Sequence, residues 1–434
     1  MRKQAVNGNR QFAWRSRDFI PKGMIAFLLL IGTACSRPDS LVNEIIQSVK
    51  AEYAPDKRTV LFDVLPDWKG KRLILSGETS SPEAKQALFR QLDHAGIEAA
   101  DSVRLLPGPE EGSAIFGIVR LSVSNLRVKP AHSAEMATQV LLGTPLKILR
   151  DGGDWLQVQT PEQYIAWTQR SGLVRLDSAG FAAWRRKPKL IFTAETGLAF
   201  RAPASQEIVS DLVMGNMLAL EGERDAYFQV SFPDGRTGFI AKNEAQLLDR
   251  WLGGLHPDGE SIFQSARTMM GVPYLWGGTS FKGVDCSGFT KTAYFMNGII
   301  LPRDASQQVL VGEPVAIRAG DTVNLSTALR NLQKGDLIFF TNDPARRNEA
   351  DARITHVGIY IENGEFIHSS GLVHRSSLVD TAASFSAHHA KTLTQARRVL
   401  TEAPRYEHGL ALISAHPLYA TGRNGNNRKE AQGQ

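Results

Sequence analysis

The sequence predicts a multidomain chain: a small α+β domain first, two small β-barrels in the middle and an α+β domain at the C-terminus. The length of 434 residues exceeds what one hydrophobic core usually fills, so several domains are expected. Residues 115–177 and 190–248 repeat one another at an offset near 72 residues, which indicates two copies of one fold. After a Gly-rich boundary at 251–259, one apolar helical stretch is followed by alternating strands, as in an α+β domain.

The formal charge of +6 lies mainly at the two ends of the chain. Residues 1–34 carry +5 and residues 422–434 carry +2, which leaves about −1 for everything between. No basic stripe remains that could follow a phosphate backbone, so no nucleic-acid partner is predicted.

Residues 1–35 are predicted to be an export leader. A basic segment precedes the apolar stretch 24–31, which is shorter than the roughly 20 residues that span a bilayer. Small residues then precede Cys35, a pattern that resembles a bacterial lipoprotein leader and implies lipidation of Cys35. The expected location is the periplasmic side of the cell envelope, with a lipid anchor in the membrane; plain cleavage before Cys35 is the alternative.

Residues 40–107 are predicted to form the small α+β domain. The expected elements are a helix over 41–53, strands over 60–64 and 72–76, and a helix over 84–94 whose start is signalled by Ser81 and Pro82. The run from Leu73 through that helix to Leu105 resembles a BON-type domain of envelope proteins. Residues 107–112 are expected to be a linker.

The two repeats, bounded at 113–178 and 188–248, alternate apolar and polar residues between turn signals, which predicts short strands in small barrels. In the first repeat Gly143 and Trp155 stand where the second has Gly215 and Tyr227. With the late aromatic Trp167, this pattern resembles tandem bacterial SH3-like domains. Most of these aromatic residues are expected in the barrel cores.

Cys286 is a candidate nucleophile. Only Cys35 and Cys286 are present, so no disulfide framework is expected, and Cys286 precedes the apolar helical stretch 289–296. The free amides and the dipole at a helix N-terminus favour a thiolate. The neighbouring glycines are expected to let a substrate backbone approach closely. A small buried residue is the alternative reading of an isolated cysteine.

Two histidines on a predicted hairpin could supply the base. His356 alternates with the apolar residues of a strand over 355–361, so its ring is expected on the opposite face. A turn at 362–365 and a second strand, 366–369, would bring His368 beside it. The other histidines show no metal-ligand spacing, so neither a metal site nor a cofactor is predicted.

These segments together resemble the NlpC/P-60 family of papain-like peptidases, over the domain 258–400. The matching motifs are Tyr274-Leu275-Trp276-Gly277-Gly278, Asp285-Cys286-Ser287-Gly288, the strand after Gly335, and His356-Val357-Gly358-Ile359-Tyr360. The resemblance implies that Cys286 is the nucleophile, His356 the base and His368 the residue that orients it. It also implies that the Cys286 amide and Tyr274 stabilise the oxyanion, and that Asp285 and Ser287 line the substrate site.

The domain order resembles the YkfC-like branch of that family. This implies cleavage of peptidoglycan stem peptides between γ-D-glutamate and the L-diamino acid, with a free N-terminal L-alanine recognised by Tyr164 and by an acidic residue, for which Glu135 is the candidate. Two alternatives stay open: an amidase or acyltransferase of the same fold, and a non-catalytic lipoprotein that binds the cell wall. Residues 407–434 are expected to form a disordered tail.

Overall fold

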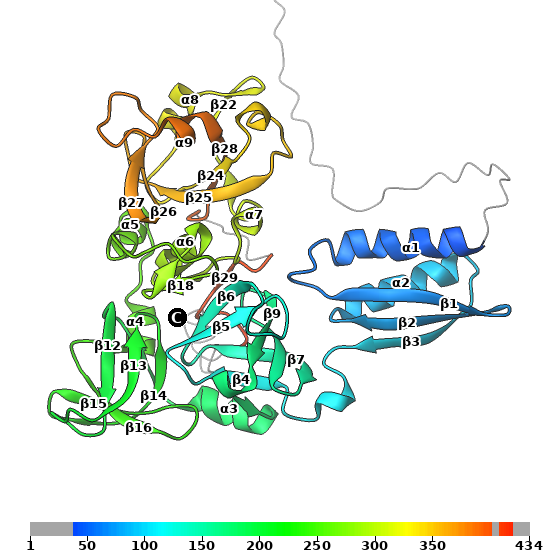
Figure 1. Cartoon of the computed structure of the whole chain (residues 1–434), viewed down its shortest axis with the longest axis horizontal. Helices are drawn as coiled ribbons and strands as arrows, with labels where there is room; N and C mark the ends of the chain where they lie inside the picture. The colour runs from blue at the N-terminus through cyan, green and yellow to red at the C-terminus, as the bar shows by residue number, and fades with distance from the viewer. Residues whose placement is uncertain (1–37, 402–407, 420–434) are drawn as a thin grey trace, which may run out of the picture. The chain divides into compact units, whose positions relative to one another are not determined.

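The N-terminal domain packs two helices on a three-stranded sheet. Its elements are α1 (Pro38–Tyr53), β1 (Phe62–Lys69), β2 (Arg72–Thr79), α2 (Pro82–His94) and β3 (Ala99–Leu105). β1 pairs antiparallel with β2, and β2 pairs parallel with β3. Both helices cover one face of the sheet (Figure 1) and share one apolar core with it. The computed structural model describes residues 38–401 and 408–419, so the predicted leader, with Cys35, lies outside the described residues.

The start of α2 follows the sequence prediction. The Ser81 hydroxyl accepts a hydrogen bond from the Ala84 amide at 3.0 Å, and Pro82 occupies the first turn. Ser81 therefore satisfies an amide that the helix itself leaves unpaired. The predicted linker contains one turn of 3₁₀ helix, η1 (Pro109–Glu111), before the first barrel.

Two barrels follow, and each is a seven-stranded sheet. The first contains β4 (Phe116–Val119), β5 (Val123–Arg127), β6 (Met136–Leu141), β7 (Pro145–Gly152), β8 (Trp155–Gln159), β9 (Ile165–Gln169) and β10 (Leu173–Leu176), with the short helix η2 (Arg170–Gly172). The second contains β11 (Lys189–Phe192), β12 (Thr196–Phe200), β13 (Ile208–Val213), β14 (Met217–Arg224), β15 (Tyr227–Ser231), β16 (Thr237–Ala241) and β17 (Ala245–Leu247). The helix α3 (Ser178–Arg186) joins the two barrels.

The two barrels share one topology. The strand order is β10-β4-β7-β8-β9-β5-β6 in the first, and the second has the same order with each strand number raised by seven. β7, β8 and β9 begin 72 residues before β14, β15 and β16 respectively. Gly143 and Gly215, also 72 residues apart, both have positive φ, at 82° and 90°, which a glycine adopts without strain. The repeat read from the sequence is therefore a repeat of structure.

The C-terminal domain is built on a six-stranded sheet, with strand order β21-β28-β24-β25-β26-β27. Its strands are β21 (Glu313–Pro314), β24 (Leu337–Thr341), β25 (Ile354–Tyr360), β26 (Glu365–Ser370), β27 (Leu372–Ser377) and β28 (Leu393–Arg398). The helices are α4 (Leu248–Gly253), α5 (Gly259–Arg267), α6 (Cys286–Phe295), α7 (Ala305–Gln308), α8 (Leu325–Asn331), η3 (Pro344–Arg346) and α9 (Ala387–Thr392). Short two-residue strands complete it: β18 (Thr279–Ser280), β19 (Gly283–Val284), β20 (Ile299–Ile300), β22 (Arg318–Ala319) and β23 (Thr322–Val323).

Apolar clusters lie on both sides of this sheet. Val357 and Ile359 of β25 join α5 and α6 in one cluster, whereas Tyr360 of the same strand joins Phe340 and Phe366 in another. Because β25 alternates between two apolar layers, the face that carries His356 is itself largely covered. The His356 ring lies on the face opposite Val357 and Ile359, as the sequence predicted, and it packs there against Phe340.

The predicted tail is partly ordered. Residues 411 and 412 form β29 (Ala411–Leu412), which pairs antiparallel with β20, and Ile413 is fully buried. The predicted disordered tail over residues 407–434 is therefore wrong for residues 408–419, because these residues supply apolar side chains to a core. Residues 420–434 lie outside the described residues.

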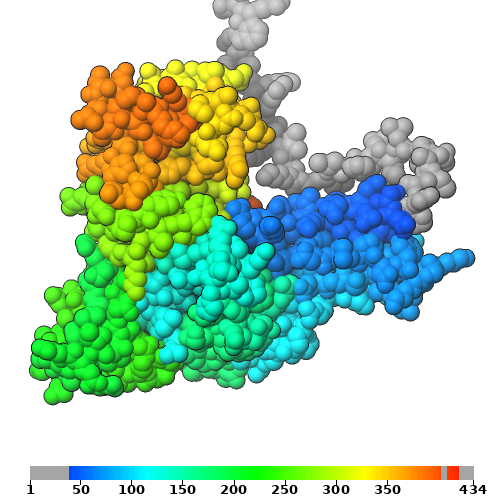
Figure 2. Space-filling model, in the orientation of Figure 1, coloured from blue at the N-terminus to red at the C-terminus, as the bar shows by residue number. Residues whose placement is uncertain are grey.

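The N-terminal domain contacts the first barrel, as Figure 2 shows for the blue and cyan surfaces. Leu61 and Leu106 pack against Leu149 and Ile165 of the barrel, and Gln159 Nε2 donates to the Thr59 carbonyl at 2.9 Å. In the part of the chain that the structure describes, no helix is both long and apolar enough to span a membrane.

Candidate active site

Cys286 is the first residue of α6, directly after the N-cap residue Asp285. One oxygen of the Asp285 carboxylate accepts a hydrogen bond from the Gly288 amide at 2.7 Å, which caps the helix. The sulfur is buried, and the backbone amides of Ser287 and Val357 face it. Val357 follows His356 in β25, so the start of α6 meets the strand that carries the candidate base.

The glycines around Cys286 serve the chain's own backbone. A Cβ at Gly288 would lie 1.9 Å from the Gly278 carbonyl oxygen, and a Cβ at Gly278 would lie 2.3 Å from the Gly283 carbonyl oxygen. The loop before α6 thus packs against the first turn of the helix with no room for a side chain. The expectation that these glycines admit a substrate backbone is wrong for Gly278 and Gly288.

The thiol of Cys286 is held in its protonated form. Burial and then the nearby Asp285 carboxylate raise the pKa of this thiol to about 12, against the two amides that favour the thiolate. The predicted thiolate is therefore wrong for this arrangement, because the loss of hydration raises the thiol pKa by more than the helix N-terminus lowers it.

His356 and His368 form a hydrogen-bonded relay. His356 Nε2 lies 2.8 Å from His368 Nδ1, and His368 Nε2 lies 3.0 Å from the Ser376 hydroxyl. β26 pairs with both β25 and β27, which brings the three residues together. The chain of contacts leaves His356 Nδ1 as the nitrogen that can exchange a proton with another group.

Both rings are neutral at neutral pH. Burial, followed by the neighbouring His389 and His388, lowers the pKa of His356 to about 3. Burial, followed by His356, lowers the pKa of His368 to about 2. The resting pair is thus a thiol and a free imidazole, and proton transfer must accompany attack.

Tyr274 belongs to the same site. Burial, then the proximity of Cys286 and of Asp285, raises the pKa of the Tyr274 phenol well above its ordinary value, so its hydroxyl stays a hydrogen-bond donor. The residue is half-buried and forms a β-bridge with Val284, two positions before Cys286.

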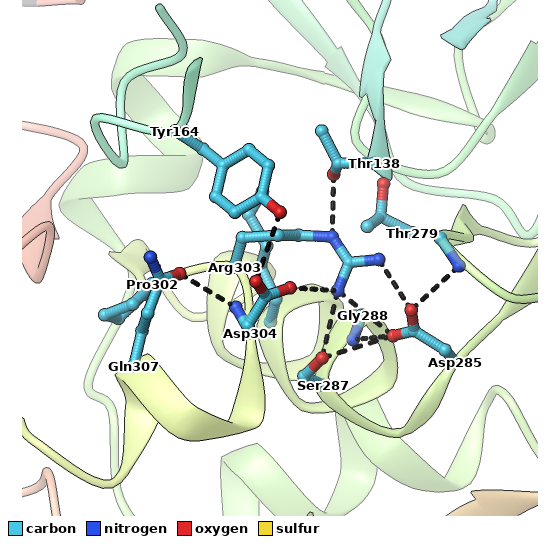
Figure 3. Close-up of polar contacts among 12 residues, drawn as sticks. Thr138, Tyr164, Thr279, Asp285, Ser287, Gly288, Pro302, Arg303, Asp304 and Gln307 are labelled. Carbon is cyan, nitrogen blue, oxygen red and sulfur yellow. Dashed lines mark hydrogen bonds and ion pairs between the residues drawn. The ribbon is translucent and has the colours of Figure 1, made fainter. Parts of the chain in front are cut away.

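A buried arginine holds Asp285 and Ser287 (Figure 3). Arg303 is 1% exposed, and its guanidinium donates to both Asp285 oxygens, at 3.1 and 2.7 Å. It also donates to the Ser287 hydroxyl at 2.9 Å and to Thr138 Oγ1 of the first barrel at 2.7 Å. Burial lowers the pKa of Arg303, but the Asp285 carboxylate more than offsets it, so the arginine stays charged. Asp285 and Ser287 are thus tied into a network that joins two domains.

Tyr164 contacts Asp304 (Figure 3). Its hydroxyl donates to Asp304 Oδ2 at 3.1 Å, and the same oxygen accepts from Arg58 Nη1 of the N-terminal domain at 2.7 Å. Glu135 has another partner: its Oε1 accepts from the Trp276 indole at 2.8 Å. The acidic group that the structure brings to Tyr164 is therefore Asp304.

Sequence reasoning missed Arg303, Asp304 and His389, whose ring centroid lies 5.2 Å from that of His356. Asp304 precedes the short helix α7 and forms a capping box with Gln307, whose Oε1 accepts a hydrogen bond from the Asp304 amide. A single capping pattern says nothing about the distant Tyr164. His389 lies in a six-residue helix 33 positions after His356, and no periodicity relates the two.

Comparisons with known proteins agree with this geometry. Residues 271–398 match the model of the NlpC/P60 family, and residues 126–173 match that of the bacterial dipeptidyl-peptidase SH3 domain. The C-terminal domain belongs to the NlpC/P60 family of cysteine peptidases. It follows a domain of the SH3 type, as the sequence predicted.

Relatives match a little more than half of this chain. A γ-D-glutamyl-L-lysine dipeptidyl-peptidase of Bacillus cereus is 29% identical over 246 residues, which are 55% of this chain and 68% of the relative. The Bacillus subtilis protein of the same name is 29% identical over 244 residues, 54% of this chain and 71% of the relative. A crystal structure of an NlpC/P60 family protein from Bacillus cereus covers 66% of this chain and 100% of that chain, with a TM-score of 0.55 and 24% identity. That structure supports the fold.

Proposed function

We propose that this chain is a cysteine endopeptidase that cleaves the γ-D-glutamyl–L-diamino acid bond of peptidoglycan stem peptides whose N-terminal L-alanine is free. The observation that carries the proposal is the relay from His356 through His368 to Ser376, on a strand whose next residue, Val357, turns its amide to the sulfur of Cys286 at the start of α6. Both Bacillus relatives are γ-D-glutamyl-L-lysine dipeptidyl-peptidases by name, which supports the choice of bond.

The proposed reaction uses His356 as base and then as acid. For Nδ1 to accept the Cys286 proton, Nε2 must carry its hydrogen and donate it to His368 Nδ1, while His368 Nε2 donates to Ser376. The sulfur attacks the γ-carbonyl carbon as its proton moves to Nδ1. The imidazolium returns this proton to the leaving amine, which leaves a thioester on Cys286. Water then attacks the thioester with the same histidine as base, and the acid product departs.

The oxyanion of each tetrahedral intermediate is proposed to accept hydrogen bonds from the Cys286 amide and the Tyr274 hydroxyl. The amide is one of those that α6 leaves without a partner in the helix. The raised pKa of the Tyr274 phenol keeps its proton available for donation. Such preorganised donors commonly contribute 10²–10³-fold to kcat, or roughly 3–4 kcal/mol.

The free ammonium of the substrate is proposed to bind at Tyr164 and Asp304. Asp304 provides the carboxylate for which the sequence indicated Glu135, and the Asp304 side chain is 25% exposed. A carboxylate and a phenol oxygen both accept hydrogen bonds from an ammonium, whereas an amide-linked alanine offers one donor and more bulk. The site would thereby select stem peptides already detached from the glycan.

Export and lipidation at Cys35 are also proposed, which would place the peptidase on the periplasmic side of the cell envelope with its anchor in the membrane. The support is the basic and apolar leader sequence. Mass analysis of the mature N-terminus tests it: an acylated Cys35 is expected, and an unmodified Met1 in the mature protein would contradict the proposal.

The test of the proposed function is cleavage of L-Ala-γ-D-Glu-L-Lys, followed by mass spectrometry of the products. Wild type should release L-Ala-γ-D-Glu, and Cys286→Ala should release none. An N-acetylated peptide should be cut at least ten-fold more slowly, and Asp304→Asn should reduce that preference.

Undiminished turnover by Cys286→Ala would dispose of the mechanism. Products cut at another bond would favour the amidase or acyltransferase reading, and wall binding with no product would favour the non-catalytic one.

A further inference from the structure

Three histidines converge on one point beside the candidate active site. Donor nitrogens of His356, His368 and His389 all lie within 4.8 Å of one another. Their ring centroids are 4.7–5.2 Å apart, and Phe340 and Phe366 pack against the group. His389 plays no part in the proposed reaction, so its place in this group is unexplained by it.

Serine hydroxyls occupy one nitrogen of His389 and one of His368, which leaves the other nitrogen of each ring for a metal. His389 Nδ1 is bonded to the Ser386 hydroxyl at 2.7 Å, which leaves its Nε2. His368 Nε2 is bonded to Ser376 at 3.0 Å, which leaves its Nδ1, and that atom already lies 2.8 Å from His356 Nε2. Metal-binding histidines are typically oriented in this way, through a hydrogen bond made by the nitrogen that does not bind the metal.

The separations suit a small divalent cation. Metal–nitrogen bonds of about 2.0–2.1 Å in a tetrahedral site put the nitrogens roughly 3.4 Å apart. His356 and His368 would need to separate slightly from 2.8 Å, and the widest pair would need to close from at most 4.8 Å. Three imidazoles with a fourth open position suit Zn²⁺ in particular.

We propose that His356, His368 and His389 form a Zn²⁺ site that reversibly inhibits the peptidase. Zn²⁺ binds the lone pair of His356 Nε2, so the hydrogen of the neutral ring moves to Nδ1 and the hydrogen bond to His368 that orients the base is lost. With its hydrogen on Nδ1, the ring has no lone pair left to accept the thiol proton. The inhibition rests on the proposed function, whereas the binding of Zn²⁺ does not.

Binding is tested in the full chain carrying Cys286→Ala, so that no thiolate can hold the metal. Co²⁺ serves as the spectroscopic probe, and Zn²⁺ is titrated calorimetrically. One equivalent of Co²⁺ should bind with tetrahedral visible bands, and Zn²⁺ should displace it. In the same background His389→Phe and His389→Gln should each weaken Zn²⁺ binding at least ten-fold. The matched control is His388→Phe, since His388 is the exposed neighbour in α9 and should leave the affinity unchanged.

Failure to bind Co²⁺ or Zn²⁺ below millimolar concentration would overturn the site. The site would also be overturned if both His389 variants bound Zn²⁺ as tightly as the Cys286→Ala chain does. Thermal melts of the variants verify that they are folded.

Inhibition is tested with the active chain and the L-Ala-γ-D-Glu-L-Lys substrate. Zn²⁺ should abolish turnover, and a chelator should restore it. In His389→Phe the inhibitory Zn²⁺ concentration should rise at least ten-fold, measured against the turnover of that variant in the absence of metal. An unchanged inhibitory concentration would mean that the metal acts at Cys286 and His356 alone, which overturns the proposal. Metal binding without activity on any peptide would refute the proposed function while leaving the site intact.

Discussion

Replacement of the buried Arg303 is the sharpest test of how the candidate site is assembled. Arg303→Met keeps most of the side-chain volume and removes the charge. It leaves the Asp285 carboxylate, 9% exposed, without the guanidinium that contacts both of its oxygens. Asp285 would keep the amides of Gly277 at 2.9 Å and Gly288 at 2.7 Å. It would have no opposite charge in contact.

The expected cost is large for a single substitution. Breaking a buried ion pair by removing one partner costs about 3–5 kcal/mol. Because two amides remain on Asp285, the lower end, about 3 kcal/mol, is the better expectation. For a domain of this size the melting temperature should fall by roughly 10 °C. Turnover should fall as well, since Asp285 caps the helix that begins with Cys286.

Scanning calorimetry measures this loss, because it separates the transitions of a multidomain chain. The double variant Asp285→Asn with Arg303→Met removes both charges and keeps an N-cap side chain. It should be more stable than Arg303→Met alone. A single variant within 1 °C of wild type, or a double variant that is less stable than the single one, would refute the assignment of Arg303 as the counter-charge.

Three further predictions concern the base, the loop and acid stability. His368→Leu should lower kcat about 10–100-fold with little change in KM, because the His356 ring loses its orienting partner; an unchanged kcat would contradict the relay. Gly288→Ala should destabilise the domain by at least about 2 kcal/mol, since its Cβ would lie 1.9 Å from a carbonyl oxygen, whereas Gly253→Ala, with no atom within 4 Å, should be neutral in the same melts. The pKa of His356 is about 3 in the folded chain and 6.5 ordinarily, so on acidification the unfolded chain takes up the proton first. The free energy of unfolding should therefore fall between pH 6.5 and about 3, with this ring contributing up to ~1.4 kcal/mol per pH unit. Urea unfolding of wild type and His356→Phe at pH 7 and 5 measures the difference, and equal losses would show that the ring does not bind protons on unfolding.

Local patterns in the sequence predicted the parts of the site that lie in one segment. The helix that begins at Cys286 and the hairpin that pairs His356 with His368 are each local structures, so apolar periodicity and turn signals were enough to predict each one. The two barrels were predictable because the second repeats the sequence pattern of the first at a fixed offset, which shows that both have the same fold.

Groups that meet only through tertiary packing could not be predicted. Arg303 reaches Thr138 across 165 positions, and Tyr164 reaches Asp304 across 140. No periodicity operates over such separations. The protonation of Cys286 was also mispredicted, because a helix start is visible in sequence and the burial that overrides it is not.

The position of Asp304 has a consequence for work with fragments. One carboxylate oxygen is shared between Arg58, from a domain that begins the described chain, and Tyr164, from the first barrel. A shortened protein lacking either domain would therefore expose an acidic group that the full chain keeps engaged. The substrate selectivity of an isolated C-terminal fragment would therefore differ from that of the full chain, even if the fragment folds and retains its thiol chemistry.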